Sequence, residues 1–173
     1  MKHRPTLLDF GLLIFISFVW GSSFLAIKIG LRAFDPFSLA ATRVFIAGFF
    51  MYLVARLRGE IFPTDKTILK QLALIGLFGS SAFMLISWGQ QYISTSTAGI
   101  MLAFGPLNLL FLAHFMTEDE KLSIPKLIGF GFGFAGVALL FSGAGLANIE
   151  TEGFGMVAMF VASIAYALSM IFV

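Results

Sequence analysis

The fold is decided by an apolar stretch near the amino end, residues 9–31, which reads DFGLLIFISFVWGSSFLAIKIGL. A helix of about 20 mostly apolar residues is long enough to cross the hydrocarbon core of a bilayer. Five further stretches of this kind follow, separated by short polar segments: residues 37–55, 68–88, 96–116, 127–145 and 153–173. The sequence therefore predicts an all-α, polytopic membrane protein with about six transmembrane helices.

The composition indicates the same lipid surroundings. Hydrophobic residues make up 59% of the chain and charged residues 12%, whereas an average soluble domain has about 25% charged residues. The net charge of +2 is small and no basic face appears, so nucleic acid is not an expected partner. With no cysteine and two histidines, neither a metal site nor a bound cofactor is predicted. The partner that this composition does predict is the lipid bilayer.

The charged residues of the loops predict an orientation. If the spans alternate, one side of the membrane receives eight basic residues, namely Lys2, Arg4, Arg56, Arg58, Lys66, Lys70, Lys121 and Lys126. The other side receives Arg32, Asp35, Glu150 and Glu152. Lysine and arginine concentrate in cytoplasmic loops. We therefore expect a multi-pass protein of the inner membrane with its amino terminus in the cytoplasm.

Two basic residues lie inside predicted spans. Lys28 is within a turn of the outer boundary, where snorkelling to the interface is usually sufficient. Arg43 lies about two turns inside the second span, a depth at which a charge is costly and faces the interior of a bundle. Two interpretations of Arg43 carry equal weight. It contacts an anionic group of a substrate, or it is a structural tie to backbone carbonyls or to a loop carboxylate such as Asp35.

Other polar or helix-breaking residues also lie at membrane depth. Trp20 and Ser23 occupy the middle of the first span, where a lipid-facing helix would carry Leu or Val, and either helix packing or pocket lining explains them. In the fourth span, Pro106 removes a backbone hydrogen bond and predicts a kink, and Asn108 adds an amide nearby. Together with Arg43, these four residues are the predicted lining of a central cavity.

The fifth span contains the glycine-rich run IGFGFGFAGV, residues 128–137. Gly131, Gly133 and Gly136 match the spacing G-x-G-x-x-G, but no strand precedes them and no βαβ unit surrounds them, so we reject a dinucleotide site. Gly129, Gly133 and Gly136 instead form one stripe of small residues along a helix, and we predict that this stripe packs closely against another helix.

Four segments resemble those of the EamA-type drug/metabolite transporters: WGSSFLAIKIGL, DPFSLAATRVFIAGFFMYL, GQQYISTSTAGIMLAFGPLNLLFLAHF and EDEKLSIPKLIGFGFGFAGVALL. They cover most of residues 18–140. Residues similar to those of the family pattern are Trp20, Gly21, Pro36, Arg43, Tyr92, Ser94, Pro106, Glu120 and Gly129. The resemblance implies a ten-helix transporter made of two five-helix repeats of opposite orientation, which exports or exchanges small metabolites through a central cavity.

This chain then corresponds to about half of such an inverted-repeat transporter. We expect residues 1–145 to form the first repeat, 146–152 an external loop, and 153–173 the first helix of a truncated second repeat, because Val173 ends the chain within apolar sequence. A constant offset relates Ser17, Trp20, Gly21 and Ser23 to Ser163, Tyr166, Ala167 and Ser169. Alternating access needs both repeats. The expected partner is thus the missing second repeat, unless two copies pair as a homodimer.

The predicted function is that of a permease that moves a small organic metabolite by alternating access. One alternative is a small multidrug-efflux-like subunit acting as an oligomer, although such proteins have a glutamate in the first span and none is present here. Another is a non-transporting membrane scaffold held together by its glycine seams. An enzyme is not expected, because no acid dyad, His-Glu metal pair or serine with a general base lies at membrane depth.

Overall fold

The computed structural model describes residues 6–60, 62–117, 123–143 and 149–172. Within these residues all regular structure is helical and no strand occurs. The helices are α1 (Leu7–Gly30), α2 (Pro36–Leu57), α3 (Lys66–Gly89), α4 (Thr95–Leu102), α5 (Gly105–Met116), α6 (Ile124–Gly143) and α7 (Ile149–Ile171). The predicted all-α, polytopic membrane fold is confirmed.

By length and composition, five helical stretches of the described chain are able to cross a membrane. They are α1, α2, α3, the α4–α5 pair as one span over Thr95–Met116, and Glu152–Ile171 of α7. The apolar stretch of α6 among the residues searched, Ile124–Gly136, is shorter. Ile27 is the buried residue of α1 and Ala40 that of α2. The apolar side chains of these two helices are otherwise largely exposed, as hydrocarbon surroundings allow.

Local capping explains where two of the long helices begin. Asp35 Oδ1 accepts hydrogen bonds from the backbone N–H groups of Phe37 and Ser38, each at 3.0 Å, and Pro36 fills the first helical position. Hydrogen bonding to Ser38, first through its side chain and then through its backbone N–H, lowers the pKa of the Asp35 carboxyl. Asp65 caps α3 in the same way. Both helices therefore start at a carboxylate that satisfies their free backbone donors.

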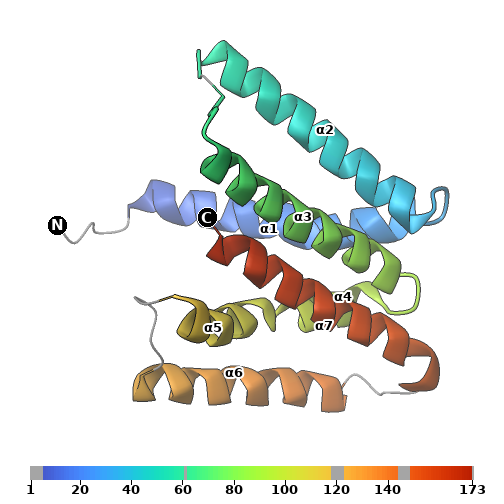
Figure 1. The fold of residues 1–173 in the computed structure, drawn as a ribbon. Helices are drawn as coiled ribbons and strands as arrows, with labels where there is room; N and C mark the ends of the chain where they lie inside the picture. The colour runs from blue at the N-terminus through green and yellow to red at the C-terminus, as the bar shows by residue number, and fades with distance from the viewer. Residues whose placement is uncertain (1–5, 61, 118–122, 144–148, 173) are drawn as a thin grey trace.

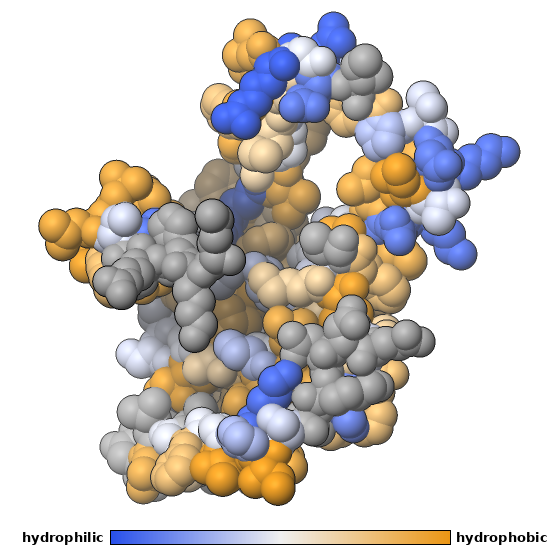
Figure 2. All heavy atoms as spheres, turned by 90° about the vertical axis from the view of Figure 1, so that its left-hand side faces the viewer, coloured by the Kyte–Doolittle hydropathy of each residue, from blue (hydrophilic) through white to orange (hydrophobic). Residues whose placement is uncertain are grey.

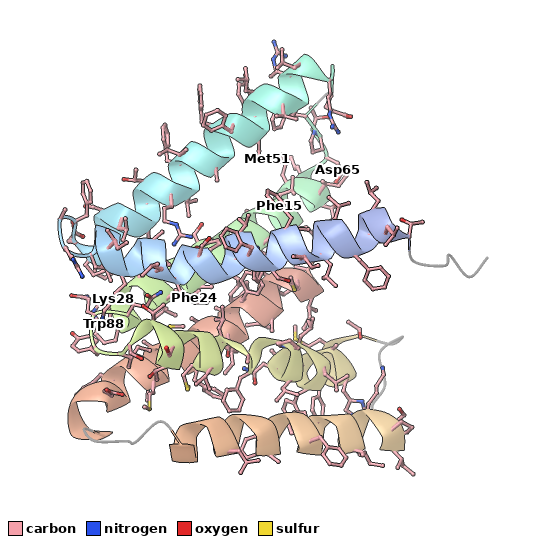
Figure 3. All side chains as sticks on the ribbon, turned by 180° about the vertical axis from the view of Figure 1, so that it is seen from behind. Phe15, Phe24, Lys28, Met51, Asp65 and Trp88 are labelled. Carbon is pink, nitrogen blue, oxygen red and sulfur yellow. The ribbon has the colours of Figure 1, made fainter. Side chains whose placement is uncertain are left out.

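Figure 1 shows α2, α3 and α7 side by side, with α1 crossing behind α3 and α6 at the lower edge. α3 packs most extensively against α7 and also against α2, whereas α4 contacts α1, α6 and α7. The α1–α2 and α3–α4 connections lie at one end of the molecule and the α2–α3 connection lies at the opposite end. Lys28 and Trp88 mark one of these ends and Asp65 marks the other (Figure 3).

Four described basic residues gather at the end of the molecule where α2 stops and α3 starts, whereas Arg32, between α1 and α2, lies at the other end. Arg56 and Arg58 close α2, and Lys66 and Lys70 lie in the first turns of α3. Figure 2 views the molecule from this side and shows hydrophilic residues over the end of α2 and the start of α3. Lys2, Arg4 and Lys121 lie outside the described residues. The grouping expected from alternating spans is thus present, and the assignment of this end to the cytoplasm stays a prediction.

Two boundaries differ from those predicted. The predicted span 96–116 is interrupted, because α4 ends at Leu102 and α5 begins at Gly105, one residue before Pro106. The break lies where the missing N–H of proline predicted a kink. In addition, α7 begins at Ile149 rather than at residue 153, so the last part of the predicted external loop is helical. Residues 144–148 of that region lie outside the described residues.

The closest helix contact is the crossing of α3 and α7. A Cβ atom placed on Gly155 would lie 2.6 Å from Ile93 Cγ2 and 2.8 Å from the backbone oxygen of Gly89. No larger residue than glycine fits there without movement of the backbone. The buried core surrounds this crossing and consists of Ile27, Ile86, Ile93, Ala98, Met101, Met159 and Ala162. This core fixes α3 and α7 as two walls of the site described next.

Candidate functional site

The guanidinium of Arg43 lies between three helices. Its Nη2 atom donates a hydrogen bond of 2.9 Å to Ser23 Oγ of α1, and its central carbon lies 5.5 Å from the centre of the Phe83 ring of α3. The face of an aromatic ring attracts a cation at this distance. Nη1 is buried and has no hydrogen-bond partner among the described residues. One donor of Arg43 thus holds α1, and another remains unused.

This guanidinium lines a pocket of about 260 Å³. Its polar groups include those of Ser23 and Arg43, and its apolar walls include Trp20, Phe24, Phe83 and Tyr166. These residues come from α1, α2, α3 and α7. The structure therefore brings together three of the predicted cavity residues, Trp20, Ser23 and Arg43. A concave, mostly apolar pocket with a few polar groups is the usual form of a small-molecule site.

An aromatic pair separates this pocket from a second one. The rings of Trp20 and Tyr166 meet edge to face, with their centroids 5.9 Å apart and their planes at 81°. Both residues, together with Leu102, also line the second pocket, which has a volume of about 190 Å³ and includes the predicted Pro106. The two pockets are thus neighbours on either side of one aromatic contact.

A third pocket continues the series toward the end of α5. Its volume is about 430 Å³, and it shares Pro106, Leu109 and Met170 with the second pocket. It extends along α5 as far as Thr117. The three pockets together follow α4, α5 and α7 from the Arg43 guanidinium to the end of the molecule where α5 stops.

Asn108 is placed differently from the other predicted cavity residues. It is not among the lining residues of these three pockets. Its Nδ2 atom donates a hydrogen bond of 2.6 Å to Ser163 Oγ, which in turn donates to the backbone oxygen of Phe160 at 2.7 Å. In this structure the amide joins α5 to α7 beside the second pocket, which Ser163 lines.

Lys28 makes contacts that the sequence did not predict. Its Nζ atom donates hydrogen bonds to the backbone oxygens of Gln90 at 2.6 Å and Ile93 at 2.8 Å. These carbonyls lie in the connection between α3 and α4. Lys28 therefore does more than reach the interface, because it ties the end of α1 to that connection, close to Trp88 (Figure 3).

Sequence reasoning did not identify Phe83, Leu102 and Tyr166 as pocket residues. Phe83 and Leu102 are apolar residues in predicted membrane spans, where lipid-facing and pocket-facing apolar side chains look alike. Tyr166 did carry a signal, since it occupies the position that the predicted internal repeat relates to Trp20. The structure brings these two related positions into direct contact.

Only one glycine of the predicted stripe in α6, Gly133, lies close to another helix. A Cβ atom on Gly133 would lie 3.3 Å from Leu107 of α5, whereas one on Gly129 or Gly136 would meet nothing within 4 Å. The proposed packing role of Gly129 and Gly136 thus stays a prediction.

An all-helical, multi-pass membrane protein with a mostly apolar pocket that holds an arginine at membrane depth has an architecture typical of membrane transport proteins. Residues 10–142 match the EamA-like transporter family. The chain belongs to this family, and it is embedded in a membrane as a multi-pass protein.

Named relatives agree with the family assignment. The "Uncharacterized inner membrane transporter YedA" of Escherichia coli (strain K12) is 29% identical over 175 residues, covering 99% of this chain and 55% of the relative. The "Uncharacterized transporter YoaV" of Bacillus subtilis is 22% identical over 162 residues, covering 92% of this chain and 55% of the relative. The "Probable terminal-alkyne amino-acid exporter" of Streptantibioticus cattleyicolor is 27% identical over 141 residues, covering 80% of this chain and 46% of the relative.

The chain spans about half the length of the curated relatives it matches. No solved structure matches the chain.

Proposed function

We propose that this chain forms one half of a permease that moves a small organic metabolite across the bilayer by alternating access. The observation that carries the proposal is the series of three pockets linked by shared residues, from Arg43 to Thr117. A solute that crosses a membrane needs consecutive sites along the helices, and a packed scaffold needs none. The pocket at Arg43, which has the most polar groups at membrane depth, is the proposed solute site.

The second half of the pathway comes from outside these 173 residues. Two observations support this: the relatives are about twice as long, and the apolar surfaces of α1 and α2 are largely exposed. The contact between Trp20 and Tyr166 supports an inverted repeat, since related positions of two repeats meet where a pseudo-two-fold axis passes between them. A second repeat is the proposed source of the other half, and a second copy of the chain is the alternative.

The direction and orientation of transport are also proposals. The relative from Streptantibioticus cattleyicolor is named an exporter, which supports export. The basic residues at the end of α2 and the start of α3 support a cytoplasmic position for that end and for the amino terminus.

Solute flux tests the proposal. The chain is reconstituted into vesicles at increasing numbers of copies per vesicle, and the vesicles are loaded with radiolabelled amino acids, monocarboxylates and sugars. If each chain supplies half of the pathway, vesicles with one copy release no solute in a saturable manner. Saturable release is expected once a second-repeat segment of a longer relative is co-reconstituted with the chain. Release without that segment, at a rate that rises more steeply than the number of copies, would instead assign the other half to a second copy.

Two results would contradict the proposal. Saturable release from vesicles with one copy would show that the chain transports without a second half. No release at any density, with or without the second-repeat segment, would favour the non-transporting scaffold if the full-length relative is active in the same vesicles.

A further inference from the structure

We infer that the pocket at Arg43 binds a carboxylate that carries a small apolar body, such as an aryl or alkyl group, and that Nη1 of Arg43 is the group that receives the carboxylate. This inference rests on the proposed function, because it names the chemical class of solute for the site proposed above. It is carried by the unused donor, by the charge of the pocket and by the chemistry of the pocket walls.

The unused donor of Arg43 points to a missing acceptor. Nη2 is occupied by Ser23 Oγ at 2.9 Å, and the face of the guanidinium is held by the Phe83 ring. Nη1 is buried without a hydrogen-bond partner among the described residues. A buried cationic donor that lacks a partner is costly. Since guanidinium N–H groups fit the oxygens of a carboxylate, an anionic ligand supplies the acceptor that is lacking here.

The charge of the pocket supports the same ligand. Among its lining residues Arg43 is the only one with a charged side chain, and none is Asp or Glu. A cationic ligand would therefore meet repulsion without compensation. A neutral ligand would leave the positive charge at membrane depth without a counter-ion. An anion satisfies both the charge and the donor.

The walls indicate what the remainder of the ligand is. Trp20, Phe24, Phe83 and Tyr166 line the same pocket as the guanidinium and give it aromatic walls. Burial of an apolar group against such surface is favourable, whereas a sugar or a second charge would lose its hydration. The volume of about 260 Å³ is close to the lower limit for ligand pockets and suits a ligand of the size of phenylacetate.

The experiment uses the tryptophan of the pocket as its reporter. The chain has two tryptophans, so Trp88→Phe leaves Trp20 as the only one. This variant of the full chain is placed in phosphatidylcholine nanodiscs, and the fluorescence of Trp20 is followed while phenylacetate is added. Phenylacetamide, which has the same shape and no charge, is the matched probe. We expect saturable binding of phenylacetate that is about 10- to 100-fold tighter than that of phenylacetamide.

Three variants in the same background assign the effect to Arg43. Arg43→Gln is expected to weaken phenylacetate binding to the level of phenylacetamide and to leave phenylacetamide binding unchanged. Arg43→Lys keeps the charge, so it should retain part of the preference and also serves if Arg43→Gln fails to fold. Arg58→Gln removes the same charge from the exposed end of α2 and is expected to change neither affinity by more than about twofold.

A last arm separates a soluble carboxylate from a lipid headgroup. Nanodiscs that contain phosphatidylglycerol should bind phenylacetate within a fewfold of the original affinity, whereas a loss above tenfold would assign Arg43 to the headgroup and overturn the inference. Equal affinity for phenylacetate and phenylacetamide, or no binding of either, would also overturn it. Saturable solute release without a preference for anions would overturn only this inference and leave the proposed function intact.

Discussion

Lys28 and Arg43 each connect the helix that carries them to another part of the chain. Lys28 of α1 binds two carbonyls between α3 and α4, and Arg43 of α2 binds Ser23 of α1. A cation inside a membrane helix is stable only where such acceptors surround it. The two residues differ in one respect. Nζ of Lys28 donates to two backbone carbonyls, whereas Nη1 of Arg43 has no acceptor among the described residues.

This difference predicts a structural role for Lys28. We expect Lys28→Met to lower the free energy of unfolding by about 1–2 kcal/mol, because two charge-assisted hydrogen bonds are lost and two carbonyls lose their donor. The measurement is unfolding of the purified chain in detergent, followed by helical circular dichroism. Lys70→Met, which removes a charge from an exposed position near the start of α3, is the control and should have little effect. Equal effects of the two substitutions would contradict the role assigned to Lys28.

At the same scale, the sequence predicted Trp20, Ser23 and Arg43 because polar and aromatic residues at membrane depth are conspicuous among aliphatic ones. It did not predict Phe83 as the partner of Arg43. The chain contains 22 phenylalanines, and nothing local distinguishes one that faces a pocket from one that faces lipid. The choice is made by the crossing of helices, which the hydropathy of a single helix does not encode.

At the scale of helices, the crossing of α3 and α7 determines the walls of the pocket. Ile86 of α3 and Tyr166 of α7 both line it, and each lies on a helix held by the contact between Gly89 and Gly155. Close approach of the two backbones depends on the absence of side chains at both positions. A shift of this crossing would therefore change the shape of the pocket.

We predict that Gly155→Ala lowers the free energy of unfolding by about 1–3 kcal/mol, since its Cβ atom would overlap Ile93 and the backbone oxygen of Gly89. Gly153→Ala is the matched control two residues earlier, where a Cβ atom meets nothing within 4 Å. It should be neutral or slightly stabilising, because alanine favours a helix by up to about 1 kcal/mol over glycine. The free energies of unfolding of both variants are measured by denaturation in the same detergent. A tolerated Gly155→Ala would mean that α3 and α7 do not cross in this way.

The helices themselves were largely predictable. Length and apolar composition located each one, and Pro106 located the break between α4 and α5, because these signals are local. The start of α7 at Ile149 was not predicted. Its first turn carries Glu150 and Glu152, which suggest a loop by polarity although polar residues are common in the first turn of a helix.

At the scale of the molecule, the series of pockets and the exposed apolar faces belong together. The pockets are not fully enclosed by this chain, and the relatives contain about as much sequence again. Hydropathy predicted about six crossings. Five helical stretches of the described chain are long and apolar enough to cross, and the described apolar stretch of α6, Ile124–Gly136, is shorter. The arrangement of helices around Arg43 could not be predicted, since the same spans pack in many ways with equal burial from water.

The most direct test of a solute pathway through this molecule is the access of water to the Arg43 pocket. Because the chain contains no cysteine, Ser23→Cys introduces a single thiol in the pocket. Phe18→Cys introduces a single thiol elsewhere on the same helix, at an apolar residue that is 73% exposed in the chain. Both variants are reconstituted in vesicles and treated with a charged, membrane-impermeant methanethiosulfonate. We predict modification at position 23 at least about tenfold faster than at position 18, because only the pocket admits water, and thiolate rather than thiol is the reactive form. Equally slow modification at both positions would mean that the pocket is closed and would contradict a transport pathway at Arg43.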